Sequence, residues 1–226
     1  MKKHAICIFA HPDDEAFGPG GTIHRLTKTH TVSIICVTNG DAGENHHPTE
    51  KGTLATIRQG EIRSSSKIMG VTDLFFLNYS DGELCNNKYH EIAASIQAIL
   101  DDKRPELLLT FEHRGISGHI DHITIAMIAS YLYQRLSYVR KIMFYCLSEA
   151  QRSKRGDDYF IFFPPGYKTE AIDYSNDISD IIDLKVEAMK QHLSQSKDLN
   201  RILERELRTV EHFYVWEKPT TPKSSK

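Results

Sequence analysis

Short apolar runs alternate with amphipathic segments along the whole chain. The first run, AICIFA at residues 5–10, is continuous and ends at polar residues, which is typical of a strand buried on both faces of a sheet. The run TVSIICVT at residues 31–38 is rich in β-branched residues and predicts a second strand. Further strands are predicted at 73–77, 107–111, 141–147, 159–163 and 212–216.

Segments with helical periodicity lie between these runs. In 90–103, for example, Ile92, Ile96 and Leu100 recur at helical spacing. Helices are predicted at 20–28, 53–69, 90–103, 120–136, 186–193 and 199–210. Repeated alternation of strand and helix predicts an α/β fold with a mostly parallel central sheet and helices on both of its faces. Ligands bind such a sheet beyond the carboxyl ends of its strands, where the strand order switches.

Composition narrows the class of protein further. The chain has 226 residues, of which 40% are hydrophobic and 26% charged, as in ordinary folded proteins. We expect a single domain over residues 1–216 and a frayed polar tail over 217–226. A net charge of −2 provides no basic field for nucleic acid, so we expect no nucleic-acid partner. No apolar run reaches the roughly 20 residues of a membrane span, and the first is too short for a signal peptide.

The four cysteines, Cys7, Cys36, Cys85 and Cys146, form no CxxC pair, and three of them lie in apolar runs. In a chain of this length such cysteines are most simply buried, reduced thiols. We therefore expect a cytoplasmic protein without disulfides.

A cluster of an imidazole and carboxylates directly follows the first predicted strand, in the sequence HPDDE at residues 11–15. Pro12 ends the strand, and the spacing of His11 and Asp14 allows a tight turn to aim both at one point. A solvated acidic helix start is the alternative. A dinucleotide loop is disfavoured, because the glycines that follow do not fit GxGxxG and the acids would repel a pyrophosphate.

A second cluster, GHIDH at residues 118–122, follows the strand predicted at 107–111. Taken alone, it is equally well explained as a capped helix start with surface histidines. In a doubly wound sheet the two strands are neighbours, so His11, Asp14 and one or both of His119 and His122 can converge. Two imidazoles and one carboxylate suit Zn²⁺ with a fourth position for water, and they also suit non-haem Fe²⁺.

These residues resemble the motifs of the PIG-L/LmbE-like de-N-acetylase family. AHPDDE at residues 10–15 matches the signature of the family, and GHIDH matches its second motif, in which Pro is common at the place of Ile120. Weaker similarities follow in the order of the family: an R-x-x-E helix at 58–61 with Gly70, the loop NYSDGEL at 78–84, and a KxxAxxxHxSQ segment at 185–195.

The resemblance implies a Rossmann-like three-layer sandwich and a zinc-dependent hydrolase that removes acetyl groups from N-acetylglucosamine-type amides. It implies that His11, Asp14 and His122 are the ligands of one Zn²⁺ per chain, with Fe²⁺ as the alternative metal. The implied substrate is a small N-acetyl amino sugar or its glycoside, without stable membrane insertion. A homo-oligomer is compatible with this interpretation.

The resemblance also implies roles for residues that do not bind the metal. Asp13 is expected to be the general base, His119 the charged residue that stabilises the oxyanion and protonates the amine, and Asp121 the partner that orients His119. Arg58 and Asp81 are expected to contact sugar hydroxyls. Considered without the family, Arg58 is as well explained by a surface ion pair, and Asp81 by an ordinary turn before glycine.

Two other functions remain open at this point. A different metal hydrolase, such as a phosphoesterase, would use two metal ions and more carboxylates. A non-catalytic sugar-binding protein could retain the fold, although mere metal binding would not require the spare carboxylate of Asp13. His192 lies on a predicted amphipathic helix and is interpreted as a packing residue.

Overall fold

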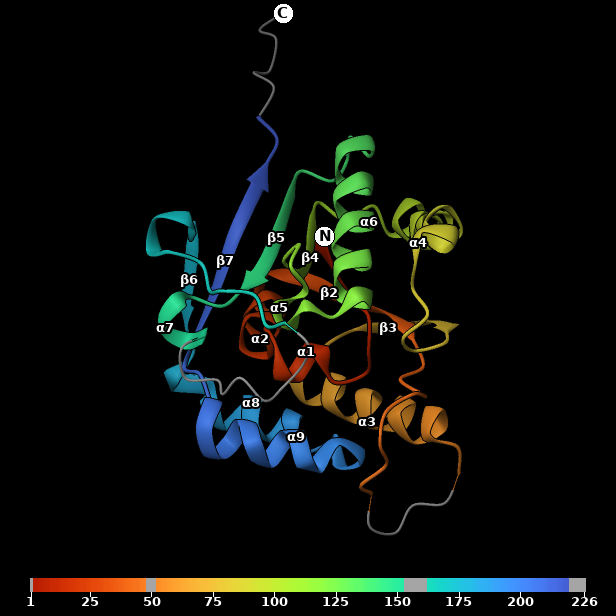
Figure 1. Ribbon diagram of the computed structural model, residues 1–226. Coiled ribbons are helices and arrows are strands. Elements are labelled where there is room, and N and C mark those ends of the chain that lie inside the picture. Colours follow the sequence, from red (N-terminus) through yellow and green to blue (C-terminus); the bar gives the residue numbers. More distant parts are fainter. Residues whose placement is uncertain (1, 48–51, 153–161, 220–226) are drawn as a thin grey trace, which may run out of the picture.

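A computed structural model describes residues 2–47, 52–152 and 162–219 of the chain. In this part, seven strands form one sheet in the order β3-β2-β1-β4-β5-β7-β6 (Figure 1). The strands are β1 (Lys3–Phe9), β2 (His30–Thr38), β3 (Asp73–Tyr79), β4 (Leu107–Phe111), β5 (Lys141–Cys146), β6 (Tyr174–Asp177) and β7 (Val210–Glu217).

The five strands from β3 to β5 are parallel, whereas β7 and β6 add to one edge in antiparallel fashion. The chain runs outward from β1 through β2 to β3 and then returns to build β4 on the other side of β1. Cys7 of β1 pairs with Ile34 of β2 and with Leu109 of β4. The predicted α/β class, with a mostly parallel sheet and a switch in strand order between β1 and β4, is confirmed.

Helices cover both faces of this sheet. They are α1 (Asp14–Phe17), α2 (Gly20–Thr29), α3 (Leu54–Met69), α4 (Tyr89–Lys103), α5 (Gly115–Gly118), α6 (Ile120–Arg135), α7 (Glu149–Arg152), α8 (Ile182–Met189) and α9 (Ser196–Arg201), with short 3₁₀ and π turns between them. Helices α4 and α6 lie on one face, and α2, α3, α8 and α9 lie on the other (Figure 1).

The alternation of side chains along β1 divides the core into two halves. Cys7 and Phe9 join the cluster beneath α2 and α8, and Ile6 and Ile8 join the cluster beneath α4 and α6. All four side chains are at most 1% exposed. Full burial of an aliphatic or aromatic side chain contributes about 1.5–3 kcal/mol, so this uninterrupted apolar run fixes β1 at the centre of the sheet.

Near the C-terminus the strand predicted at 212–216 is confirmed as part of β7, whereas the helix predicted before it is shorter than expected. The helix predicted over 199–210 ends as α9 at Arg201, continues as a π turn over Ile202–Glu206, and gives way to β7 at Val210. The β-branched and aromatic residues of VEHFYVWE favour a strand that can pair with β5. Strand β6 was not predicted, because it is short and polar and forms only by pairing with β7.

The strand predicted at 159–163 and the tail predicted at 217–226 extend beyond the residues that the structure describes. The strand predicted at 159–163 lies mostly outside the described residues, and 162–163 have no regular structure. Of the predicted tail, Glu217 belongs to β7, and 220–226 are outside the described part.

All four cysteines are unpaired, as expected, and all but Cys85 are buried. No helix within residues 2–47, 52–152 and 162–219 has both the length and the apolar character that crossing a bilayer requires.

A buried ion pair joins α8 to β7 and to the start of α2. Lys185 Nζ donates to Glu211 Oε1 at 2.7 Å and to the carbonyl of Gly18 at 2.6 Å. The other bonds of the Glu211 carboxylate come from the backbone N–H groups of Gly21 and Thr22, at 3.0 and 2.7 Å. A carboxylate at this position satisfies first-turn donors of α2 and complements its dipole.

Glu211→Ala is expected to lower the free energy of unfolding by about 3–5 kcal/mol, because it leaves the Lys185 ammonium buried without a counter-charge. Urea unfolding followed by circular dichroism measures the change. Lys3→Ala is the control: its side chain is 69% exposed, so loss of its pair with Glu106 is expected to cost at most about 1 kcal/mol. If both variants lose the same free energy of unfolding, the buried Lys185–Glu211 pair contributes no more to stability than an exposed pair.

Candidate metal and active site

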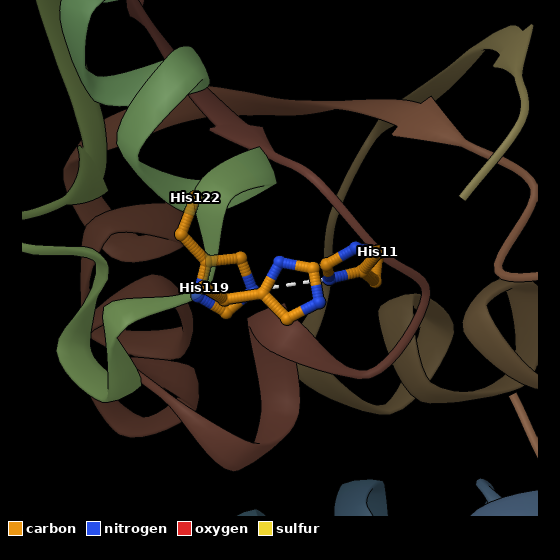
Figure 2. A group of neighbouring side chains, drawn as sticks. All are labelled: His11, His119 and His122. Atoms are coloured by element: carbon orange, nitrogen blue, oxygen red, sulfur yellow. Dashed lines mark hydrogen bonds between the residues drawn. The ribbon is translucent and has the colours of Figure 1, made fainter. Parts of the chain in front are cut away.

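The loops that follow β1 and β4 meet at the carboxyl edge of the sheet because these strands are adjacent and parallel. Figure 2 shows that His11, from the first loop, faces His119, which ends the second loop, and His122, in the first turn of α6. The ring centre of His11 lies 4.6 Å from that of His119 and 4.9 Å from that of His122. The structure therefore brings together two clusters that are about a hundred residues apart in the sequence.

The turn after β1 has a strained backbone. Asp13 has φ 122° and ψ −27°, a region that residues other than glycine rarely adopt and that costs on the order of 1–3 kcal/mol. Surrounding hydrogen bonds hold this conformation: the Asp13 N–H donates to Glu15 Oε2 at 3.0 Å, and Arg58 donates to the carbonyl of Pro12 at 2.5 Å. The turn gives the two acids different partners: Asp13 contacts Arg58, and Asp14 contacts His122.

Hydrogen bonds to the far side of each imidazole fix the protonation of His11 and His122. His11 Nε2 lies 2.9 Å from Asp81 Oδ1 and 3.2 Å from Asp121 Oδ2, so this nitrogen carries the hydrogen. His122 Nδ1 lies 3.0 Å from the carbonyl of Gly115 and must also be the donor. In the neutral tautomers, His11 Nδ1 and His122 Nε2 therefore offer lone pairs, and they face each other at 3.0 Å.

Asp14 completes this set of ligand atoms. Its Oδ1 lies 3.2 Å from His122 Nε2, and its Oδ2 lies 3.6 Å from His11 Nδ1. Tetrahedral Zn²⁺ with ligands at 2.0–2.1 Å would hold them about 3.3 Å apart. Two lone pairs and a carboxylate at this spacing suit a cation between them, so the residues present fit a divalent metal with one open position. His119 is close enough to be considered as a further ligand, in a group with His11 and His122.

The charges around His11 favour positive charge at this point. Burial opposes protonation of His11, but hydrogen bonds to Asp121 and Asp81 outweigh it and raise the pKa of His11 to about 10. Burial would raise the pKa of Asp14, yet His122 and His11 hold it far below its ordinary value. The carboxylates of Asp14, Asp81 and Asp121 thus stabilise a positive charge among them, which either a proton or a metal ion can supply.

Asp13 lies beside the ligand set with Arg58 as its counter-ion. Arg58 Nη2 donates to Asp13 Oδ2 at 2.9 Å, and only 3% of Arg58 is exposed. Burial raises the pKa of Asp13 to about 7 despite the guanidinium. A carboxyl group whose pKa lies near 7 can both accept and release a proton near neutral pH.

His119 has a different environment from the one expected. It is the N-cap of α6, and its Nδ1 accepts the backbone N–H of Asp121 at 3.2 Å, which leaves the hydrogen on Nε2. Burial and the nearby charges of His11 and His122 lower the pKa of His119 to about 4. These surroundings favour a neutral imidazole that donates through Nε2.

Asp121 contacts imidazoles of both loops. Its carboxylate accepts from His11 Nε2, from the N–H of Gly82 at 2.8 Å and from the N–H of Leu84 at 3.1 Å. Its backbone N–H donates to His119 Nδ1. Asp121 therefore orients His11 through its carboxylate, a contact that the sequence did not predict.

Arg58 and Asp81 both line the cavity at this site. Arg58 is already engaged, by Asp13 and by the carbonyls of Pro12 and Gly40. A surface ion pair does not explain this arginine, because its side chain is buried. Asp81 has one oxygen on His11, whereas its other oxygen lies 3.9 Å from Arg58 Nη1.

Sequence reasoning missed a second layer of buried acids. Glu15 is fully buried and accepts from His192 Nε2 at 2.7 Å and Ser65 at 2.8 Å, besides the N–H of Asp13. His192, interpreted as a packing residue, is thus part of the support of the strained turn. Its place in the KxxAxxxHxSQ segment was the available signal. Glu112, directly after β4, was also missed.

The cavity over the site has a volume of about 290 Å³. Besides the polar cluster, its lining includes an apolar group, Phe17, Phe111, Ile116, Tyr145 and Leu147, and a polar group from the C-terminal part, Gln195, Asp198, Arg201 and Arg208. This size is near the lower limit of small-molecule sites, which suits one ring and its substituents.

Comparisons with known proteins identify relatives of this chain. The family model for GlcNAc-PI de-N-acetylase (PIG-L) matches residues 6–133. A probable N-acetyl-α-D-glucosaminyl L-malate deacetylase 2 from Bacillus cereus is 28% identical over 203 residues, covering 87% of this chain and 86% of the relative. A diacetylchitobiose deacetylase from Thermococcus kodakarensis is 30% identical over 218 residues, covering 94% and 78%.

Solved structures show the same fold. An N,N'-diacetylchitobiose deacetylase from Pyrococcus horikoshii has a TM-score of 0.69 at 23% identity, covering 98% of this chain and 88% of that one. A 4-carboxy-2-hydroxymuconate hydratase from Pseudomonas putida reaches 0.67 at 16% identity, covering 99% and 100%. Because a deacetylase and a hydratase share this fold, the fold alone does not identify the reaction.

Asp121→Asn is expected to weaken Zn²⁺ binding by about ten-fold or more. Both carboxylate oxygens accept hydrogens, so an amide nitrogen at either position faces a donor and disturbs the tautomer of His11. Competition with a chromophoric chelator measures the affinity. Asp101→Asn, whose carboxylate contacts only Tyr138 and Gln97 among the described side chains, is the matched control. Unchanged affinity in Asp121→Asn would show that Asp121 does not hold His11.

Proposed function

Since the chain belongs to the PIG-L (GlcNAc-PI de-N-acetylase) family, we propose that it is a metal-dependent deacetylase that hydrolyses the N-acetyl group of an N-acetylglucosamine-type sugar or glycoside. One observation carries the proposal. His11 Nδ1, His122 Nε2 and the Asp14 carboxylate form a half-open ligand set, and the non-ligand carboxylate of Asp13 lies beside it.

We assign the metal as one Zn²⁺ held by His11, Asp14 and His122, with Fe²⁺ as the alternative. When bound, the ion supplies Lewis acidity, which polarises an amide carbonyl and acidifies water. Two imidazoles and one carboxylate are the borderline ligands that Zn²⁺ prefers, and three protein ligands leave a position for chemistry.

Asp13 is the proposed general base. Its carboxylate is not needed to hold the ion, and its strained turn is maintained by Glu15 and Arg58. A carboxylate in this position takes the proton from the attacking water and can pass it to the leaving amine. Positioned proton transfer of this kind contributes about 10²–10⁴-fold to the rate.

His119 is the proposed donor to the oxyanion. Because its Nδ1 accepts the N–H of Asp121, its Nε2 carries the hydrogen and can donate to the carbonyl oxygen as negative charge develops there. A neutral donor suits this position, since a second full positive charge beside a metal ion would be repelled. The role expected from the sequence is retained, but its charge is not.

The sugar is proposed to lie against Asp81 and Arg58. The second oxygen of Asp81 is an acceptor at the cavity, and the Arg58 guanidinium is fixed by its bonds to Pro12 and Gly40. Hydroxyl groups that lose water on binding need such fixed partners. The Gln195, Asp198, Arg201 and Arg208 group then faces the substituent at the far end of the sugar.

The alternative of a two-metal phosphoesterase fits the second acidic group less well. His11, Asp81 and Asp121 are close enough to suggest another ion. However, Asp121 is already saturated by His11 Nε2 and two backbone N–H groups. These acids therefore support the imidazole of His11 and leave a single metal position.

His122→Ala is expected to abolish both stoichiometric zinc binding and acetate release, because it removes one of three ligands. Zinc content is measured by atomic emission, and acetate is measured with a coupled assay on N-acetylglucosamine, its methyl glycoside and diacetylchitobiose. A variant that releases acetate at the wild-type rate would exclude the proposed site.

Asp13→Asn is expected to keep its zinc and to lower kcat by about 10²–10⁴-fold. Asparagine tolerates positive φ better than most residues, so the turn should be retained. The same acetate assay, run with zinc-saturated protein, measures the effect. Normal turnover by the zinc-loaded variant would show that Asp13 is not the base.

A further inference from the structure

The loop between β4 and α6 is organised around the buried carboxylate of Glu112, which is 2% exposed. Glu112 Oε2 accepts the backbone N–H of Arg114 at 2.7 Å and the hydroxyl of Tyr167 at 2.8 Å. Glu112 Oε1 accepts the N–H of Ile116 at 2.9 Å. No carbonyl of a helix or strand accepts these two N–H groups in the part of the chain that the structure describes. The Glu112 carboxylate accepts them instead and so defines the path of the loop.

The peptide bond between Gly115 and Ile116 connects this carboxylate to His122. Its N–H donates to Glu112, and its carbonyl accepts from His122 Nδ1 at 3.0 Å. The two groups of a trans peptide point in opposite directions, so one peptide plane is held between a carboxylate and an imidazole. Hydrogen bonds in such a chain polarise one another, which makes the carbonyl of Gly115 a stronger acceptor.

This peptide adopts an unfavourable conformation to make both bonds. Ile116 has φ 63° and ψ −57°, a strained region for a β-branched residue, and Gly115 has φ 68°. A side chain at Gly115 would approach Ile123 and His122 at 3.0–3.1 Å. Strain of this kind persists only when surrounding bonds enforce it, and the hydrogen bonds of this peptide to Glu112 and His122 are among those that do so.

We propose that Glu112 is a positioning residue for the metal: through the Gly115–Ile116 peptide it fixes the orientation and tautomer of His122 and strengthens Nε2 as a ligand. The inference rests on the metal site of the proposed function. In many metal sites a carboxylate accepts the second N–H of a metal-binding imidazole and so fixes its orientation. Glu112 has the same effect on His122, but it acts through one peptide group.

Tyr167 and Arg114 hold Glu112 in place. The Tyr167 hydroxyl donates to Oε2, and the Arg114 guanidinium lies over the Tyr167 ring, 3.9 Å from its centre. Tyr167 reaches this position because its segment pairs with Ser148, after β5. Tyr138 has a similar environment away from the site: its hydroxyl donates to Asp101 Oδ1 at 2.7 Å, and the Arg104 guanidinium lies 4.1 Å from its ring centre.

The test measures zinc affinity by chelator competition in Glu112→Gln, Tyr167→Phe and Tyr138→Phe, together with the urea stability of each metal-free protein. Glu112→Gln is expected to bind Zn²⁺ about ten-fold more weakly. Tyr167→Phe should show a smaller loss in the same direction, and Tyr138→Phe, whose hydroxyl contacts Asp101, should show none. Acetate release by Glu112→Gln should recover when excess zinc saturates the site.

A purely structural role predicts a different pattern, in which zinc affinity follows stability equally in all three variants. That pattern would overturn the proposal, and so would wild-type zinc affinity in Glu112→Gln. His122→Ala distinguishes a failure of the Glu112 proposal from a failure of the metal site itself. If His122→Ala loses zinc while Glu112→Gln keeps it, Glu112 has no positioning role and the metal site stands. If His122→Ala also keeps zinc, the proposed site itself fails.

Discussion

The parallel pairing of β1 with β4 is the constraint on which the site depends. Parallel strands end at the same edge, so the residues after Phe9 and those after Phe111 emerge side by side. The chain must build β2 and β3 on one side before it returns, which is why the two ligand loops are distant in sequence. Both strands are buried, so the floor of the site is rigid.

Buried carboxylates perform a common task around this floor. Glu15, Glu112 and Asp121 each accept backbone N–H groups from loops, and each also supports a side chain of the candidate site. Loops at a sheet edge have donors that no ladder satisfies, and a buried donor without an acceptor costs about 1–3 kcal/mol. The same groups therefore fold the loops and orient His11, Asp13 and His122. Strain at Asp13 and Ile116 is tolerated because these bonds over-determine the backbone.

The fold alone does not specify the chemistry of the site. A hydratase and several deacetylases share the architecture at comparable TM-scores. The proposed amide hydrolysis rests on the arrangement of His11, Asp14 and His122, and on the carboxylate of Asp13 and the imidazole of His119 beside them. The shape of the sheet positions these groups but does not select them.

The sequence by itself determined the α/β class, the central strands and the convergence of His11 with His122, because continuous apolar runs and local motifs carry that information. Only the tertiary structure decided which partner each polar group has. Asp121 turned out to hold His11, Arg58 to hold Asp13, and His192 to hold Glu15, across separations that no local spacing reveals. The reason is physical: a buried polar group bonds whichever donor or acceptor the fold brings within about 3 Å, and that neighbour is set by strand order and loop path.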